Sequence, residues 1–281
     1  MFDERPGVDC IKLHLPVESA GLNFYALGLL GEANSPEKVG VAGRAEIAFW
    51  QVEFAASAAW RKDSALRLGG DVSLGLGDFD FRVEGAVVHG DPAPFFEGPM
   101  DLATGRMPVQ VSRKDRWDPS VMGGVEATIP YGDDDSVIVG AEYSWRRAGY
   151  SDPSVYPALF ASGTFQPLYT GRHYAGIYAL LMAPGQWNDG TVILSGLGNL
   201  SDRTFTTRAD VRVTVLTHLS VNAFAWYNFG NNGELHYSLR VPAAPSSVLD
   251  LVPDEYRSMA TKGVVIRARA VDVGIGLLVR I

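Results

Sequence analysis

Side chains alternate between apolar and polar along residues 204–241, and this alternation constrains the fold more than any other feature of the chain. Ala209, Val211 and Val213 occupy odd positions, whereas Arg208 and Asp210 occupy even ones. A period of two places the two sets on opposite faces of an extended strand. Because the pattern resumes after short turns, at residues 218–229 and 233–241, it predicts successive β-hairpins.

The same alternation continues along most of the chain and predicts about fourteen strands. Most of them are about ten residues long, whereas strands of soluble sheets usually have five or six. No stretch shows a comparable helical period. The predicted strands are residues 10–16, 22–31, 38–49, 51–61, 65–77, 78–89, 119–130, 136–147, 170–182, 190–200, 203–216, 218–229, 233–241 and 264–281.

Composition excludes several classes of protein. The chain has 281 residues, of which 47% are hydrophobic and 20% charged, so it is long and apolar enough for one large β domain or two smaller ones. No run approaches the roughly 18 apolar residues of a spanning helix, which excludes a helical membrane protein. The net charge of -8 argues against nucleic acid as a partner. A single cysteine, Cys10, excludes an internal disulfide and a multi-cysteine zinc site.

The composition of the two faces indicates which one is inside. The polar face carries arginines and carboxylates in nearly equal number, as a water-filled lumen requires, and neighbouring strands are expected to pair them. The apolar face carries mainly Val, Leu, Ala and Phe, with Trp60, Tyr143, Trp145 and Tyr227 toward strand ends, which is typical of membrane-interface girdles. A soluble barrel would need these residues as its core, but a closed barrel of this many strands is too wide to fill with side chains.

Short turns alternate with three long connections at residues 89–118, 148–169 and 242–263. In outer-membrane barrels, short turns lie on one rim and long loops on the other. With fourteen strands, however, the 242–263 connection falls on the opposite rim from the other two. One strand is therefore expected to be miscounted, and residues 264–270 are the place, because the alternation changes parity at Val271 and indicates a bulge or an extra short segment.

These features resemble bacterial outer-membrane β-barrel proteins, particularly porin-like families. The resemblance rests on the amphipathic hairpins, on residues 195–239 and on the closing segment VDVGIGLLVRI. It implies an all-β fold, an antiparallel transmembrane β-barrel of about 12–14 strands with a polar lumen and a lipid-facing apolar exterior, forming one domain over residues 1–281. Family members commonly end in an aromatic residue, whereas this chain ends in Ile281.

The resemblance also implies a place in the outer membrane of a Gram-negative bacterium. The expected partners are outer-membrane lipid, lipopolysaccharide, the barrel assembly machinery and small polar solutes; the pattern does not require a trimer. The opening MFDERPGVDC lacks the basic and apolar regions of a signal peptide, so we expect a mature form or the C-terminal part of a longer barrel.

The leading functional hypothesis is a porin-like channel for passive passage of small polar solutes, which is not an enzyme and needs no cofactor or metal. Charges at mid-strand positions set the field that a solute crosses. The candidate lumen and selectivity residues are Asp71, Arg82, Glu84, Glu142, Arg208, Asp210, Arg212 and Arg240.

Two other functions stay open. One is a structural or adhesive outer-membrane barrel with a closed lumen, whose loops at 89–118 and 242–263 bind a partner. The other is a soluble ligand-binding β-barrel.

Few residues suggest further chemistry. The five histidines have no metal-ligand spacing, and a serine–histidine site of Ser220 or Ser238 with His236 is a minor hypothesis. A solvated turn is favoured over a cation site for residues 133–135. An exposed loop is favoured over a phosphate-binding or lumen-constricting role for Arg113, Lys114 and Arg116.

Overall fold

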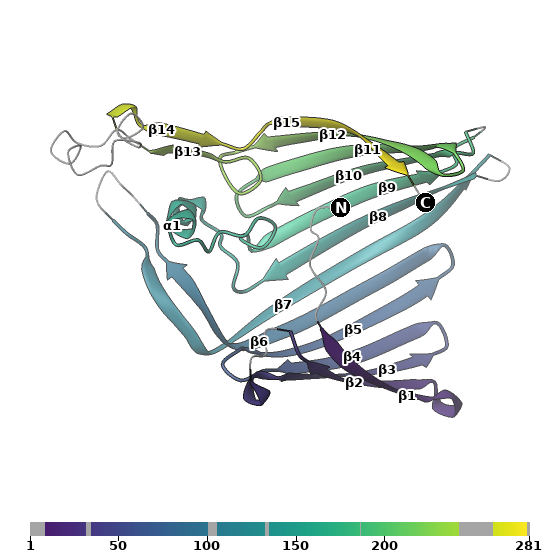
Figure 1. The fold of residues 1–281 in the computed structure, drawn as a ribbon, viewed down its shortest axis with the longest axis horizontal. Helices are drawn as coiled ribbons and strands as arrows, with labels where there is room; N and C mark the ends of the chain where they lie inside the picture. Colours follow the sequence, from purple (N-terminus) through teal and green to yellow (C-terminus); the bar gives the residue numbers. More distant parts are fainter. Residues whose placement is uncertain are drawn as a thin grey trace. The chain divides into compact units, whose positions relative to one another are not determined.

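The structure is a computed structural model that describes residues 9–31, 35–100, 106–132, 135–185, 187–241 and 261–279. Strands are the main secondary structure of these residues, and helices are few and short. The chain divides into two compact units, Met1–Glu97 with Val109–Gly149, and Gly98–Pro108 with Tyr150–Ile281. Each unit contains an antiparallel meander in which each long strand pairs with the next long strand along the chain (Figure 1).

The first unit has eight strands and two single-turn 3-10 helices. The helices are η1 (Glu18–Ala20) and η2 (Pro36–Lys38). The strands are β1 (Cys10–Val17), β2 (Leu22–Leu29), β3 (Gly40–Phe49), β4 (Val52–Trp60), β5 (Leu66–Leu76), β6 (Phe79–Glu97), β7 (Val109–Tyr131) and β8 (Asp135–Arg146). β6 and β7 are the longest of the described strands. They form a hairpin that extends beyond the ends of the neighbouring strands.

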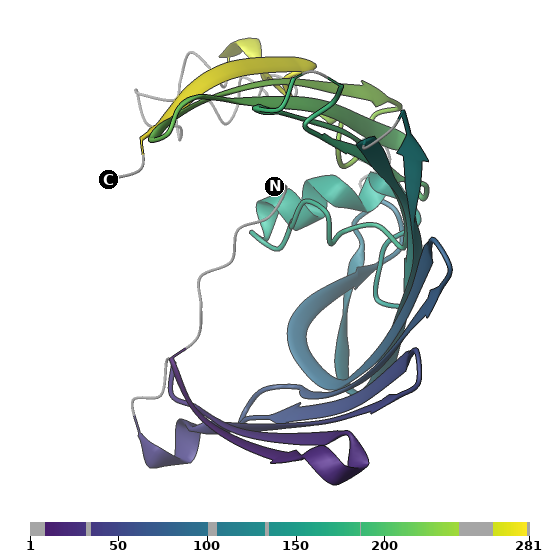
Figure 2. The ribbon, with the colours of Figure 1, turned by 90° about the vertical axis from the view of Figure 1, so that its right-hand side faces the viewer.

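The second unit has five long strands, β9 (His173–Met182), β10 (Gly190–Asn199), β11 (Thr204–Leu216), β12 (Leu219–Gly230) and β15 (Val271–Val279). Two short strands, β13 (Ser238–Val241) and β14 (Val264–Arg267), pair only with each other in the described chain. A turn of 3-10 helix, η3 (Pro153–Val155), leads into helix α1 (Tyr156–Ala161). Figure 2 shows α1 on the concave side of this unit's sheet.

The long strands confirm the predicted fold class. Thirteen strands follow the antiparallel order β1 to β12 and then β15, within the predicted 12–14. In the described residues, no helix has the length and apolar character needed to span a membrane.

Four strand predictions were wrong in extent. β6 continues past residue 89 to Glu97, and β7 begins at Val109 rather than at residue 119, so the predicted 89–118 loop is largely strand. The predicted strand 233–241 is reduced to β13, because its first residues turn inward and bury Glu234. The predicted strand 264–281 is divided into β14 and β15, as the parity change at Val271 indicated.

The longest connections of each meander lie at one of its two ends. In the second unit, the β9–β10 and β11–β12 turns lie at one end, whereas the segment before β9, the β10–β11 turn and the long β12–β15 connection lie at the other. The fourteen-strand count, which put residues 242–263 on the opposite rim and was expected to contain a miscounted strand, therefore has one wall strand too many. It counted 233–241 as a wall strand, whereas β13 pairs with β14 outside the meander.

The apolar face of each unit is exposed rather than packed into a core. On β15, Val273, Ile275 and Leu277 are 68%, 80% and 70% exposed, and on β1, Ile11 and Leu13 are 64% and 71% exposed. The buried apolar side chains gather instead around α1, at Val155, Tyr156, Ala158 and Leu159. The alternation therefore separates an apolar outer face from a polar face.

Each meander also has one strand edge without a partner among the described residues. β1 pairs with β2 alone, and β15 pairs with β12 alone.

Candidate functional site

The polar face of the first unit holds an arginine that connects β3 to β5 across the strand between them. Arg44 Nε on β3 donates to Glu46 Oε1 at 2.6 Å, and its Nη1 and Nη2 donate to the carboxylate of Asp71 on β5 at 2.8 and 3.1 Å. Arg44 can reach across β4 because the β4 residues between them, Ala55 and Ser57, are small. An arginine is paired with carboxylates on this face, as predicted, but within β3 and between β3 and β5 rather than between neighbouring strands.

The next strands of this face carry an excess of carboxylates. Glu84 on β6 lies directly opposite Asp71, and Glu142 on β8 lies opposite Gly124. Arg82 Nη2 is 3.5 Å from Glu126 Oε2 on β7. Arg82 is the partner of a carboxylate on the neighbouring strand, as predicted, while the exposed Glu84 adds negative charge to this part of the face.

In the second unit, Arg208 is held between an acid and two aromatic rings. Its Nε and Nη2 donate to the two oxygens of Asp210 at 2.7 and 2.6 Å. The guanidinium carbon lies 4.7 Å from the ring centroid of Phe224 and 5.6 Å from that of Trp226. A planar guanidinium suits both contacts, since it binds a carboxylate with two parallel hydrogen bonds and stacks on aromatic faces. The side chain is only 16% exposed.

The neighbouring strand makes room for this arrangement. A Cβ atom at Gly274 would lie 2.5 Å from the Phe224 ring, so only glycine fits opposite Phe224 on β15. On the other side of the cluster, Trp226 Nε1 donates to Asn228 Oδ1 at 2.8 Å. Arg208, Asp210, Phe224 and Trp226 therefore form a fixed group, which we call the Arg208 cluster.

The eight predicted lumen residues do not form one site. Arg208, Asp210 and Arg212 share the polar face of β11, where Arg212 Nε donates to Asn222 Oδ1 at 2.8 Å. Arg240 lies opposite Val265 in the β13–β14 pair, outside the meander, so its placement on a wall strand was wrong. The other four lie on the first unit's polar face. Their role in selectivity stays a prediction.

Phe224 and Trp226 are functional candidates that the sequence interpretation missed. It assigned Ser220, Asn222 and Asn228 to the polar face of this strand and left these two aromatic residues out. The signal was present, however. Residues 224 and 226 have the same parity as Asn222, which places them on the polar face. Their exact partners were not predictable from the tight turn at Thr217 and His218, because a register shift between Thr214 and Leu216 is what brings residue 224 opposite 210 and residue 226 opposite 208.

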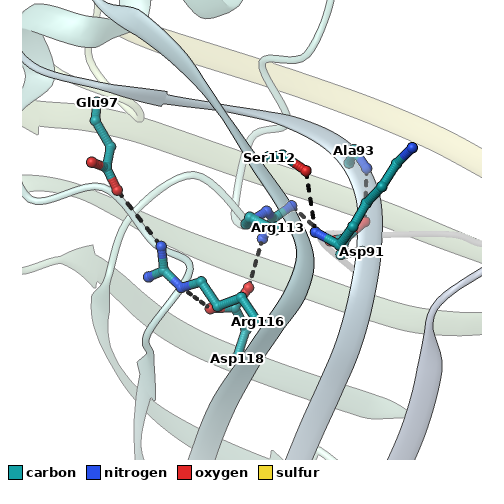
Figure 3. A network of polar contacts seen from close by, with 8 residues as sticks. Asp91, Ala93, Glu97, Ser112, Arg113, Arg116 and Asp118 are labelled. Carbon is teal, nitrogen blue, oxygen red and sulfur yellow. Dashed lines mark hydrogen bonds and ion pairs between the residues drawn. The ribbon is translucent and has the colours of Figure 1, made fainter.

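A second charged cluster fixes the extension of the β6–β7 hairpin (Figure 3). Arg113 Nη2 is 2.6 Å from Asp91 Oδ2, and its Nη1 is 3.3 Å from Asp118 Oδ2. Arg116 contacts Asp118 at 2.9 Å and Glu97 at 3.6 Å. We call these five residues the hairpin cluster. Both guanidinium groups also lie over the Phe95 ring, at 5.1 and 5.5 Å from its centroid.

The sequence explains why the hairpin bends at this cluster. The pairing register shifts between His89 and Asp91 and again before Phe95. Gly90 has a φ of +74°, and prolines at positions 92 and 94 cannot donate to a β-ladder. Figure 2 shows the hairpin curving toward the concave side of the first unit's sheet.

The structure corrects the interpretation of Arg113, Lys114 and Arg116 as an exposed loop. All three lie on β7, and Arg113 and Asp118 are buried, with side chains 8% and 4% exposed. Arg113 is occupied by two carboxylates. Because these carboxylates come from both strands of the hairpin, Arg113 contributes to holding the bent hairpin together.

A third cluster, which we call the Glu234 network, joins the α1 segment to the sheet of the second unit. Tyr156 on α1 donates to Asp202 Oδ2 at 2.9 Å. Asn199 Nδ2 donates to Asp202 Oδ2 at 3.1 Å and to Glu234 Oε2 at 2.7 Å. Tyr174 OH donates to the same oxygen of Glu234 at 2.5 Å. The network thus connects α1, β9, the β10–β11 turn and the segment after β12.

Burial governs the acid–base behaviour of this network. Desolvation of Glu234 raises the pKa of its carboxyl group above the ordinary value, and the hydrogen bonds from Tyr174, Asn199 and the Thr170 amide only partly offset the effect. Desolvation also raises the pKa of the Tyr156 hydroxyl, with the charge of Asp202 adding to the effect. Tyr156 therefore stays a neutral donor.

The minor chemical hypotheses find little geometric support. Ser220 lies near the start of β12, whereas His236 follows its far end and contacts the Gly230 carbonyl at 3.3 Å, so these two do not meet. No metal-binding group of three His, Cys, Asp or Glu side chains occurs in the described part of the chain. Asp133 and Asp134 lie outside the described residues.

The chain matches one solved structure in the comparison with known proteins. No protein-family model and no curated protein sequence matches the chain. Its fold has a TM-score of 0.40 to the crystal structure of the siderophore receptor PirA from Pseudomonas aeruginosa, with 12% sequence identity. The match covers 82% of this chain and 48% of the receptor, so the chain spans about half of the receptor's length.

Proposed function

We propose that the protein is an outer-membrane, porin-like channel that passes small polar solutes passively. The observation that supports this proposal is the division of the wall into two faces. One face exposes Val, Leu, Ile and aromatic side chains along every long strand, and the other carries arginines paired with carboxylates.

A membrane environment accounts for the exposed apolar face. Soluble monomers rarely expose continuous apolar patches larger than a few hundred Å². Burying this face in lipid is favourable by roughly 25 cal/mol per Å². A soluble barrel would place the same side chains in its core. Here, in contrast, the Ile275 side chain is 80% exposed.

The proposal also requires that the free edges of β1 and β15 be paired in the membrane. Unpaired backbone N–H and C=O groups cost several kcal/mol each in hydrocarbon, so only closed barrels or helices span a bilayer. In the functional channel, therefore, the outer edges of β1 and β15 are each hydrogen-bonded to another strand.

A structural or adhesive barrel with a closed lumen is the second candidate function. It is favoured by the occupation of Arg44 and Arg208 by acidic partners and by the position of α1 on the concave side of its sheet. This alternative predicts an intact barrel that passes no current.

Refolding and single-channel recording test the proposal. We expect the folded protein to migrate differently from the boiled protein in a detergent gel, as closed barrels do, and to give discrete conductance steps in a planar bilayer. A refolded barrel without current would contradict the channel and favour the second candidate. A chain that stays soluble and folded without detergent would contradict both.

A further inference from the structure

The apolar face of the second unit carries a groove of about 560 Å³. Its volume lies within the roughly 300–1,000 Å³ range of small-molecule sites. Most of its lining residues occupy outward-facing positions on strands β9 to β15, so the groove opens on the apolar face.

Small side chains form the middle of the groove. Gly196 on β10 is paired with Thr207 on β11, and Ala209 on β11 is paired with Ala225 on β12. These four residues occupy two adjacent outward rows of the sheet, and none extends far from the backbone. The groove is therefore a property of the sequence, which places glycine, threonine and alanine on β10 and β11 where the next outward row on one side has Val192 and Val211.

Larger apolar side chains border the groove on both sides. Ile177 and Leu194 lie on one side and are 65% and 48% exposed, whereas Tyr227 and Val271 lie on the other and are 51% and 59% exposed. Such a narrow apolar groove matches a flexible hydrocarbon chain.

Aromatic and cationic residues follow the groove toward one end of the strands. Phe229 stacks on Tyr227 and on Phe205, with ring centroids 5.4 Å apart in each pair. The exposed Arg203 lies in the β10–β11 turn, four residues before Thr207. A strand rises about 3.3 Å per residue, so Arg203 lies roughly 13 Å along the strand from Thr207. This distance is comparable to half of the roughly 30 Å thickness of a bilayer's hydrocarbon core.

We propose that this groove binds one acyl chain of a phosphate-bearing membrane lipid, with the headgroup beside Arg203. The inference rests on the proposed membrane location. The apolar groove supplies the site for the hydrocarbon chain, and the Arg203 guanidinium supplies a charge complementary to the phosphate at one leaflet's depth.

Native mass spectrometry with a defined probe lipid tests this site. The refolded protein is mixed with dioleoyl phosphatidylglycerol, and the fraction of protein that retains one lipid is measured as detergent is removed. Ala209→Phe with Ala225→Phe fills the groove and is expected to lower retention at least tenfold. Ala223→Phe is the matched control, because Ala223 faces outward on the same strand but does not line the groove, and it should retain lipid like the parent protein.

A headgroup variant tests the second half of the proposal. Arg203→Gln is expected to reduce the preference for phosphatidylglycerol over phosphatidylcholine several-fold while leaving phosphatidylcholine retention unchanged.

Heat-modifiable mobility and conductance, measured on every variant, separate the two proposals. If the filled-groove variant folds and conducts but retains lipid as the parent does, or if the Ala223→Phe control loses it equally, the lipid site is wrong. If Arg203→Gln does not change the preference, the headgroup position is wrong. If the parent protein does not insert, the proposed function itself fails.

Discussion

At the scale of single residues, arginines that look equivalent in the sequence have different surroundings in the structure. Arg208 and Arg212 lie four residues apart on the same face of β11. Arg208 is enclosed by Asp210 and two aromatic rings, whereas Arg212 contacts the neutral side-chain amide of Asn222. The period of two predicts the face of each residue correctly. It does not predict partners, because those depend on cross-strand register and on the size of neighbouring side chains such as Gly274.

The Arg208–Asp210 pair makes a testable contribution to ion selectivity. Arg208→Gln leaves the Asp210 carboxylate uncompensated, so the reversal potential in a salt gradient should shift toward cation selectivity. Asp210→Asn leaves Arg208 uncompensated and should shift it toward anion selectivity. The double variant is the matched control and should return close to the parent value. Shifts of the same sign in both single variants would contradict a compensated pair on the lumen face.

Glu234 should make the α1 segment sensitive to pH. Because burial raises the pKa of its carboxyl group above the ordinary 4.5, the folded network binds the proton more tightly than the unfolded segment does. This contribution to stability is complete below the unfolded pKa and is lost as pH rises through the folded one. Hydrogen exchange of residues 153–161, corrected for its intrinsic pH dependence, should therefore show less protection at pH 8 than at pH 4.

The Glu234→Gln variant separates this effect from general pH sensitivity. It should remove the pH dependence and weaken the network by about 1–3 kcal/mol, because an amide group then faces donors that need an acceptor. Glu97→Gln, at a carboxylate 55% exposed, should leave exchange in the α1 segment unchanged. Equal pH dependence in the Glu234→Gln variant would show that another group is responsible.

At the scale of elements, the bent β6–β7 hairpin is the part of the fold that the sequence pattern described least well. Alternation ends near His89, where Gly90 and two prolines suggest a loop, and the strands continue only because the hairpin cluster holds them together. The contact between Arg113 and Asp91 joins residues 22 positions apart, so local periodicity could not reveal it. The parity change at Val271 was, in contrast, a local signal, and it correctly indicated the break between β14 and β15.

Gly90 should be required for the bend. Its positive φ is unfavourable for other residues, and an added Cβ would lie 3.2 Å from the Lys114 carbonyl oxygen. Gly90→Ala is expected to destabilise the hairpin by about 1–2 kcal/mol, measured by urea unfolding in detergent. Gly85→Ala on the same strand is the control, because its Cβ would meet no atom within 4 Å. Equal stability of the two variants would contradict a strained bend.

Arg113 should be the main stabilising residue of the hairpin cluster. Arg113→Met leaves the buried Asp118 with one cationic partner fewer and should cost about 3 kcal/mol of unfolding free energy. Lys114→Met, on an exposed neighbouring residue, should cost less than about 0.5 kcal/mol. If the two variants lose the same stability, the cluster does not hold the hairpin.

At the scale of the whole molecule, strand number and the identity of the two faces were predictable because they depend only on alternation, length and turn residues. The edges of β1 and β15, which have no partner among the described residues, were not predictable, since strand pairing is a property of the assembled sheet. The central claim is that the apolar face contacts lipid while the charged face contacts water.

Site-directed spin labelling along β11 tests that claim most directly. Single cysteines at residues 208–214, in a Cys10→Ser background, are labelled and reconstituted in bilayers, and collisions with oxygen and with a water-soluble nickel chelate are measured. The account predicts a period of two: labels at 209, 211 and 213 collide mainly with oxygen dissolved in lipid, and labels at 210, 212 and 214 mainly with the nickel chelate. The opposite phase, or odd positions protected from both reagents as in a packed core, would contradict it.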